Sequence, residues 1–284
     1  MKTNLFRIPG CLILATLLFS VPMGMNAQTG KRINKKYFEN LPDLGRLGMS
    51  NGSHLRMTAI YVSIDQLGNT GGKIIIKGDY SRDPATGKSS WNNVTINNSP
   101  GDNAPAGPEK KIDYMENFTY VSGPEMLNES AFRSFPESVE AVYAKNLVWD
   151  MMTVESFAWN HCDSLRMNKP YYVAKKAYEF DMAGIGDYSH KNIQLEWSGV
   201  SLAGGKLCAG IEYRALYNKV NLNMQQIKAK GSEQYWGNTR VSLETGQVVF
   251  GEMYSSTSME AEVPGFDGKM PIKAVREIII EEIR

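Results

Sequence analysis

The stretch that decides the fold is Lys206-Leu-Cys-Ala-Gly-Ile-Glu-Tyr-Arg-Ala-Leu-Tyr217. Apolar side chains occupy every second position in it, at Leu207, Ala209, Ile211, Tyr213, Ala215 and Tyr217. Alternation with a period of two predicts a β-strand that buries one face. Residues 192–200 precede this strand, and Ala203-Gly-Gly205 supplies a turn between the two segments. The sequence therefore predicts an antiparallel hairpin here.

Further strands are predicted on both sides of this hairpin. Residues 54–64 and 73–77 contain β-branched runs separated by a turn-forming segment, and residues 240–243 and 247–250 flank Glu244-Thr-Gly246. Residues 259–263 and 272–283 provide the last strands. The isoleucines at 278–280 favour a strand over a helix, because β-branched side chains are stiff in helices.

One long helix is predicted at about residues 134–168. Ser134-Phe-Pro-Glu137 has the pattern of a capping box, in which the serine and glutamate side chains satisfy free amides of the first turn. Apolar residues then recur at spacings of three or four, with one longer gap, at Val139, Tyr143, Leu147, Met151, Val154, Ala158 and Leu165. Lys169-Pro170 ends the pattern, because proline cannot continue a helix.

Residues 79–111 change character: they are rich in proline, glycine and asparagine and poor in apolar side chains. We expect a long loop here, with at most a short hairpin around residues 91–96. The fold class that follows is α+β and dominated by β-structure. An antiparallel curved sheet or open barrel is covered by the one long helix, because a sheet face must be buried against another layer. In the order of its elements this architecture resembles periplasmic carriers of the lipoprotein-transport type, in which a concave sheet holds acyl chains.

The first 27 residues have the order of a secretory signal peptide. Lys2 and Arg7 precede an apolar run at residues 11–21, and the segment ends at Asn26-Ala27 before Gln28. The run is too short to span a bilayer. We expect cleavage after Ala27, a secreted or periplasmic location, and a single β-rich domain over residues 28–284. No later stretch of the sequence predicts a membrane-spanning segment.

Charge and cysteine content limit the partners and the covalent framework. The chain has 31 basic and 30 acidic residues, and loss of Lys2 and Arg7 changes the net charge from +1 to −1. A near-neutral chain has no electrostatic reason to bind nucleic acid. After cleavage the remaining cysteines are Cys162 and Cys208. They form either a disulfide, which an oxidising compartment favours, or two buried thiols.

Catalytic and metal-binding motifs are weak in this sequence. Gly48-Met-Ser50-Asn-Gly52 matches the G-x-S-x-G pattern of serine hydrolases, but a predicted strand rather than a helix follows it. His161-Cys162-Asp163 places three metal-ligating residues side by side, where they point in different directions on a helix. We therefore predict no catalytic residues, no metal site and no cofactor.

Aromatic residues are the more informative signal. Trp91, Tyr235 and Trp236 lie in polar, asparagine- and glycine-rich surroundings, which core packing does not explain. Exposed aromatic faces beside amides and carboxylates suit sugar rings, so these three are candidate ligand-binding residues. The 15 methionines would form a plastic apolar lining for a cavity.

These observations favour a non-enzymatic protein that binds or carries an apolar or amphipathic, lipid-like ligand between sheet and helix. Two alternatives remain open. One is a surface-associated module that binds a glycan or a protein through the 79–111 segment and the exposed tryptophans. The other is a hydrolase that the sequence motifs do not identify, for which Ser50 is the only candidate.

Overall fold

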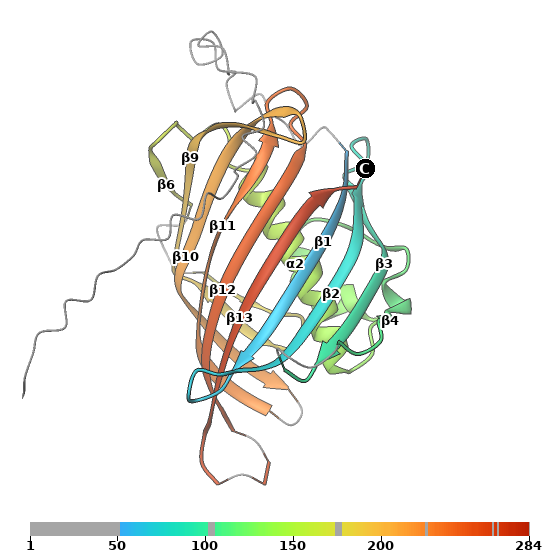
Figure 1. Cartoon of the computed structure of the whole chain (residues 1–284), viewed down its shortest axis with the longest axis vertical. Helices are drawn as coiled ribbons and strands as arrows, with labels where there is room; N and C mark the ends of the chain where they lie inside the picture. Colours follow the sequence, from blue (N-terminus) through green and yellow to red (C-terminus); the bar gives the residue numbers. More distant parts are fainter. Residues whose placement is uncertain are drawn as a thin grey trace, which may run out of the picture. The chain divides into compact units, whose positions relative to one another are not determined.

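The computed structural model describes residues 52–101, 106–173, 178–224, 227–262, 264–265 and 267–283. It contains one antiparallel sheet of 13 strands, whose main path runs β4-β3-β2-β1-β13-β12-β11-β10-β8-β7. Along this path the two end strands, β4 and β7, do not pair with each other, so the sheet is open rather than a closed barrel. Figure 1 shows the sheet curving around α2, the α-helix of the described chain. The predicted fold class is confirmed.

The strands and helices have the following bounds. The strands are β1 Ser53–Ile64, β2 Thr70–Arg82, β3 Lys88–Ser99, β4 Lys110–Lys111, β5 Phe118–Val121, β6 Pro170–Tyr172, β7 Tyr178–Asp181, β8 Gly186–His190, β9 Asn192–Ala203, β10 Lys206–Met224, β11 Ile227–Ser242, β12 Val248–Glu262 and β13 Met270–Glu282. The helices are the short 3-10 turns η2 Asp113–Met115, η3 Pro124–Leu127 and η4 Glu129–Phe132, and the long helix α2 Val139–Trp159.

The two ends of the described chain meet in the middle of the sheet. The last strand, β13, pairs with β1 from Leu55↔Glu282 to Ile64↔Lys273 and with β12 on its other side. This pairing joins the N-terminal strands β1 to β3 to the C-terminal strands β9 to β12. The face of the sheet that bears Met57, Ile278 and Ile280 is therefore continuous and buried against α2. This face forms the sheet side of the candidate site.

The hairpin predicted around Ala203-Gly-Gly205 is present as β9 and β10, although not every apolar position of β10 is buried. Gly204 and Gly205 form its turn with φ values of 55° and 79°, which glycine adopts without strain. Ala209, Ile211, Tyr213 and Ala215 are buried as predicted, but the side chain of Tyr217 is 64% exposed. A register shift between Ala215 and Asn218 inserts one extra residue into β10, and this bulge turns Tyr217 outward.

The helix is shorter than the sequence pattern predicted. It begins at Val139, because the Ser138 hydroxyl accepts a hydrogen bond from the Ala141 amide and caps the first turn. Ser134 precedes this cap and lies outside the helix, so the expected capping box is wrong. The helix ends at Trp159, and Leu165 is buried in the turns that follow. The expectation of a helix to residue 168 is therefore also wrong.

The expected loop at residues 79–111 is largely sheet. Strand β2 continues to Arg82, and β3 returns as a 12-residue strand paired with it. The turn between them is held by Asp83, whose carboxylate accepts hydrogen bonds from the Ala85 amide and the Thr86 hydroxyl. In β3 the buried residues Trp91, Val94 and Ile96 alternate with serine and asparagine, and these polar residues concealed the strand in the sequence.

The two cysteines of the described chain are free, buried thiols. The Cys162 thiol donates a hydrogen bond to the Ala158 carbonyl at 2.9 Å, and the Cys208 thiol donates to the Lys206 carbonyl at 3.5 Å. Burial raises the pKa of the Cys162 thiol to about 11. Of the two alternatives that the sequence left open, the structure therefore has the pair of thiols.

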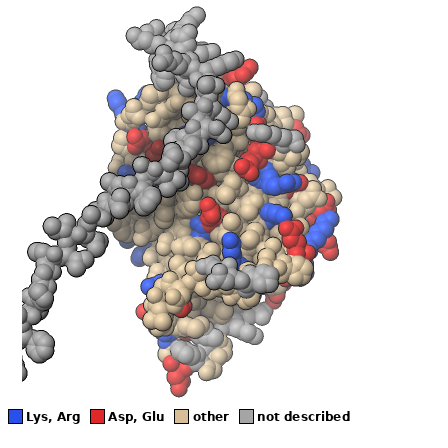
Figure 2. Space-filling model, viewed as in Figure 1, with Lys and Arg blue, Asp and Glu red and all other residues tan. Residues whose placement is uncertain are grey.

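The outer face of the sheet carries charges of both signs. Figure 2 shows basic and acidic side chains interspersed on the side formed by β1, β2 and β3. Four of them form two ion pairs, Arg56 of β1 with Asp79 of β2 and Lys77 of β2 with Glu109, the residue before β4. Among the helices that the structure describes, none has the length and apolar character needed to cross a membrane.

Candidate functional site

A cavity of about 510 Å³ lies between α2 and the inner face of the sheet. Its wall is built from α2, η3, β1, β7 to β13 and the segment between β7 and β8. The strands contribute their inward-facing positions, and α2 contributes a stripe with helical spacing. That stripe comprises Val142, Asn146, Trp149, Thr153 and Phe157. The cavity thus uses one side of α2, while the other side packs on the sheet through Leu147, Met151 and Val154.

Most of the cavity wall is apolar. One part is the buried cluster of Met182, Ile185, Tyr188 and Val220, against which Trp149, Phe180, Leu222 and Met259 pack. Met152 and Met253 also line the cavity. Methionine side chains are unbranched and adapt to ligands of different shape. This part of the wall suits an apolar chain or ring.

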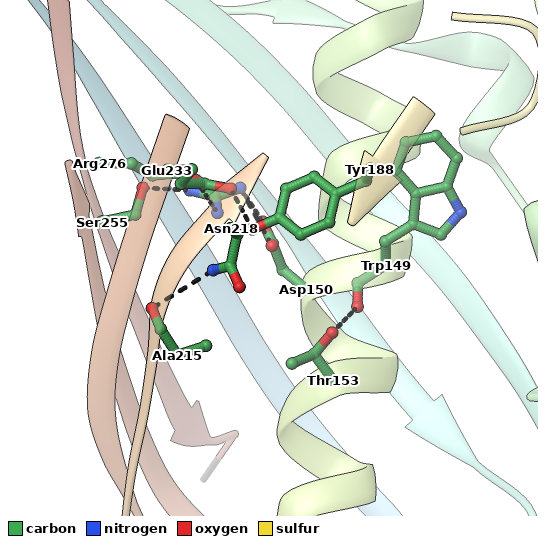
Figure 3. A network of polar contacts seen from close by, with 9 residues as sticks. All are labelled: Trp149, Asp150, Thr153, Tyr188, Ala215, Asn218, Glu233, Ser255 and Arg276. Atoms are coloured by element: carbon green, nitrogen blue, oxygen red, sulfur yellow. Dashed lines mark hydrogen bonds and ion pairs between the residues drawn. The ribbon is translucent and has the colours of Figure 1, made fainter. Parts of the chain in front are cut away.

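A cluster of charged side chains lies in the same wall. Arg276 of β13 donates two hydrogen bonds from Nη1 to the Asp150 carboxylate of α2, at 2.8 and 3.0 Å. Its Nη2 donates to Oε1 of Glu233 at 3.1 Å, and its Nε donates to the Ser255 hydroxyl at 3.3 Å. The Tyr188 hydroxyl donates to the second oxygen of Glu233 at 2.9 Å. We call these five residues the Arg276 cluster. They come from α2, β8, β11, β12 and β13, and Figure 3 shows their polar ends pointing toward one another.

The Arg276 cluster is nearly buried but open to the cavity. The side chains of Arg276, Asp150 and Glu233 keep 12%, 10% and 13% of their surface, and all three line the cavity wall. The Tyr61 ring lies 5.7 Å from the guanidinium carbon of Arg276, within the range of a cation–π interaction. The charges are therefore held in fixed positions, with part of their surface facing the space that a ligand would fill.

Burial dominates the electrostatics of this cluster. It raises the pKa of Asp150 to about 7; the attraction of Arg276 opposes this rise and the repulsion of Glu233 adds to it. Burial alone would lower the pKa of Arg276, but the attraction of Asp150 and Glu233 raises it well above its usual value. Arg276 is thus held as a cation. Burial lowers the pKa of His190, which lines the same cavity, to about 4, so His190 is neutral at pH 7.

A second buried ion pair fixes α2 to the sheet away from this cavity. Glu155 of α2 accepts a hydrogen bond from Arg82 at 3.1 Å and one from the Tyr80 hydroxyl at 2.5 Å. Ser89 bonds the same hydroxyl at 2.7 Å, and the Arg82 guanidinium lies 5.4 Å from the centre of the Trp159 ring. These residues do not line the cavity. Their role is to hold the helix in place over β2 and β3.

The structure separates the three aromatic residues that the sequence suggested as ligand-binding. Trp91 is fully buried beside Tyr80, so the expectation that it presents an exposed stacking face is wrong. Tyr235 points inward, is 4% exposed and lines the cavity. Trp236, the next residue of β11, points to the opposite face and is 45% exposed. Tyr235 and Trp236 therefore belong to different surfaces.

Trp236 lies in a cleft of about 640 Å³ on the outer face. Its ring is inclined by 26° to the ring of Tyr254 on β12, with the ring centres 6.4 Å apart. The Arg214 guanidinium beside it donates two hydrogen bonds to the Gln194 side chain, at 2.7 and 2.9 Å. Glu196, Glu212, Asn238 and Glu252 add polar groups to the wall, which also contains Leu195, Tyr213 and Leu216. This cleft combines flat aromatic faces with hydrogen-bonding groups.

Sequence reasoning missed the charged residues of the Arg276 cluster. A signal for them was present, because Arg276 occupies an inward position of β13, two residues before the buried Ile278. Asp150 likewise interrupts the apolar part of α2 next to Met151. A charged residue at a predicted core position needs a partner or a function. Neither residue's partner is recognisable from the sequence, because Asp150 and Arg276 are 126 residues apart.

The catalytic and metal-site hypotheses gain no support from the described residues. Ser50 lies outside them, as do residues 1–27 with the expected signal peptide. Within the described ranges, no group of three histidine, cysteine, aspartate or glutamate side chains is placed to hold a metal ion. His161 packs against the Tyr171 ring, and Cys162 bonds back into its own helix end. These two residues therefore have local structural contacts.

Comparison with known proteins finds a similarity to a solved structure. No protein-family model matches the chain, and no curated protein matches it. Among solved structures, a structure of lipovitellin that concerns its lipid–protein interactions is similar at 10% sequence identity, with a TM-score of 0.40. The similar region covers 82% of this chain but 25% of the lipovitellin chain, so this chain spans about a quarter of the length of that protein.

Proposed function

We propose that this protein is a non-enzymatic binder or carrier of an amphipathic, lipid-like ligand, held in the cavity between α2 and the sheet. The observation that carries the proposal is a single cavity wall that joins a large apolar surface to the Arg276 cluster. Small-molecule sites are typically concave and mostly apolar, with a few fixed polar groups and volumes of roughly 300–1,000 Å³. At about 510 Å³ this cavity falls within that range.

The apolar part of the wall supplies affinity and the polar part supplies orientation. Burial of apolar surface contributes about 25 cal/mol per Å². A chain packed against Val220, Leu222 and Met259 would therefore be held mainly by the hydrophobic effect. Its polar end would then lie at the Arg276 cluster, because a polar group left among apolar side chains loses its hydrogen bonds to water.

The proposal is tested by filling the cavity. Ala274 lines the cavity on β13, and its neighbour Lys273 is exposed on the other face. Binding of the neutral fluorescent probe N-phenyl-1-naphthylamine is measured for the wild type, Ala274→Phe and Lys273→Phe. We expect the wild type and Lys273→Phe to bind the probe alike and Ala274→Phe to lose binding. Absence of probe binding to the wild type, or equal binding to all three proteins, would contradict the proposal.

We propose further that the protein acts outside the cytoplasm, after removal of residues 1–27. The support is the order of basic, apolar and small residues in that segment, with Lys2 and Arg7 before the apolar run. Sequencing the N-terminus of protein isolated from its own cells tests this directly. We expect it to begin at Gln28. A chain that keeps residue 1 and remains in the cytoplasm would exclude export.

A second candidate function is glycan binding in the outer cleft, favoured by the exposed ring of Trp236 beside Tyr254. The test uses two aromatic residues that are both exposed, since Tyr217 on β10 is 64% exposed and does not line this cleft. Binding to immobilised oligosaccharides is measured for Trp236→Ala and Tyr217→Ala. We expect Trp236→Ala to lose binding and Tyr217→Ala to keep it. Equal binding by both variants removes this candidate.

A further inference from the structure

We propose that the ligand of the cavity carries a protonated amine as its polar end, bound by the carboxylates of Asp150 and Glu233. This inference rests on the proposed function, because it names the chemical class of the ligand for the same cavity. Three observations support it: the charges of the residues that line the cavity, the hydrogen bonds that Arg276 already donates, and the carboxylate oxygens that can accept further hydrogen bonds.

The cavity wall contains one more acidic than basic group. Its charged residues are Asp150, Glu233 and Arg276, and its histidine, His190, is neutral at pH 7. Tyr188, Ser255 and Tyr61 complete the surroundings of the cluster with hydroxyl groups and rings. A buried charge without a counterion is costly. A cation entering the cavity would balance the two carboxylates with two cations, and would favour the ionised form of Asp150, whose pKa burial raises to about 7.

The donors of Arg276 are largely occupied by the protein itself. Its Nε, Nη1 and Nη2 all donate within the cluster, to Ser255, Asp150 and Glu233. An anionic head group, such as a carboxylate, would have to replace these acceptors and would lie next to two carboxylates. The position of Arg276 therefore disfavours a fatty acid, the ligand that a buried arginine in an apolar cavity would otherwise suggest.

The acceptors are less fully occupied. Each carboxylate oxygen accepts about two hydrogen bonds. Among the residues that the structure describes, the two oxygens of Glu233 each accept one hydrogen bond, from Arg276 and from Tyr188, and the two oxygens of Asp150 each accept one from Arg276. An ammonium group has three donors and accepts none, so it complements these oxygens. The Tyr188 ring, which stacks on Phe180 at 5.5 Å, adds an aromatic face suited to a cation.

The experiment compares ligands that differ in the head group alone. Displacement of bound N-phenyl-1-naphthylamine is measured with dodecylamine, dodecanol and dodecanoate for the wild type, Glu233→Gln and Tyr188→Phe. We expect dodecylamine to bind the wild type at least about tenfold more tightly than dodecanoate, since a hydrogen bond to a charged group contributes about 1.5–3 kcal/mol. In Glu233→Gln this preference should fall about tenfold or more, and dodecanol, which carries no charge, is the reference for changes in affinity that do not depend on charge.

The outcomes separate the two proposals. If the wild type does not bind the probe, the cavity proposal fails. If the probe binds but dodecanoate equals or exceeds dodecylamine, the cavity proposal stands and the amine proposal is wrong. Tyr188→Phe is a second variant of the same cluster, in case Glu233→Gln does not fold. It removes one hydroxyl and leaves both carboxylates in place. It frees one oxygen of Glu233, so the preference for dodecylamine should be kept or increased, and its loss would contradict the proposal.

Discussion

Asp150 on α2 accepts two hydrogen bonds from Arg276 on β13, at 2.8 and 3.0 Å, and thereby joins the long helix to the last strand across 126 residues of chain. The same guanidinium also binds Glu233. Removing it leaves two carboxylates in a nearly buried place. We expect Arg276→Met to lower the free energy of unfolding by about 3–5 kcal/mol, measured by urea denaturation.

The matched control for Arg276→Met is Arg56→Met on the outer face. The Arg56 side chain is 54% exposed and pairs with Asp79. An exposed pair contributes about 0–1 kcal/mol. A loss of similar size in the two variants would show that the Arg276 cluster is not a buried ion pair in solution.

The pH dependence of stability follows from two groups that oppose each other. The pKa of Asp150 is raised to about 7 by burial, so the folded state binds more protons than the unfolded state above about pH 4, and the stability from this group is lost as pH rises to 7. The pKa of His190 is lowered to about 4 by burial, so its stability is lost as pH falls from about 6.5 to 4.

Substitution of either residue should leave the pH dependence of stability that the other residue causes. Relative to the wild type, Asp150→Asn should make the free energy of unfolding rise more steeply with pH between about 4 and 7. Over the same interval His190→Gln should make it rise less or fall. The measurement is a series of urea denaturation curves at different pH. Identical slopes in all three proteins would contradict the assigned burial of both groups.

The Tyr80 hydroxyl is expected to contribute to stability through Glu155, to which it donates a hydrogen bond at 2.5 Å inside the core. Tyr80→Phe leaves a buried carboxylate with one donor fewer, and we expect a loss of about 1–3 kcal/mol in the free energy of unfolding. The same change at the exposed Tyr217 should alter stability by less than about 0.5 kcal/mol. If Tyr80→Phe is as stable as Tyr217→Phe, the second ion pair does not hold α2 as described.

The position of the helix start can be tested with two serines that lie four residues apart. Ser138 caps α2 through the Ala141 amide, and Ser134 lies before the helix. We expect Ser138→Ala to cost about 0.5–2 kcal/mol in the free energy of unfolding and Ser134→Ala to cost less. Thermal or urea unfolding measures both. The reverse order would restore the capping box that the sequence suggested.

Cys162 and Cys208 should both react as thiols, without a reducing agent, once the protein is unfolded. In the folded protein both are buried, and burial raises the pKa of each thiol, so alkylation should be slow. Mass spectrometry after alkylation in denaturant counts the modified residues. Unmodified cysteines that react only after reduction would show a disulfide.

The fold class was predictable because it rests on local patterns. Residues 207–215 alternate, the isoleucines at 278–280 favour a strand, and the buried positions 147, 151 and 154 follow the helical period. Long strands joined by glycine turns then require a covering layer. Prediction failed for two segments in which the local sequence pattern indicates a different structure from the one that tertiary packing produces. The strand that contains Trp91 has polar outward positions, and Ser134 has the capping pattern without the cap.

The cavity itself was predictable only as a space between helix and sheet. The Arg276 cluster requires the pairing of β13 with β1 and β12, together with the rotation of α2 that turns Asp150 toward Arg276. Neither is a local property of the sequence. The sequence pattern groups Tyr235 with Trp236, but neighbouring residues of a strand point to opposite faces, and Tyr235 lines the cavity while Trp236 is exposed on the outer face.

Native mass spectrometry of the full protein, isolated from its own cells without detergent, tests the central claim most directly. We predict a reproducible added mass of a few hundred daltons, lost on extraction with organic solvent and absent from Ala274→Phe prepared in the same way. Fragmentation of the released compound would also show whether it contains an amine. A bare chain from the wild type under these conditions, or the same adduct on Ala274→Phe, would contradict the claim that the cavity between α2 and the sheet carries a ligand.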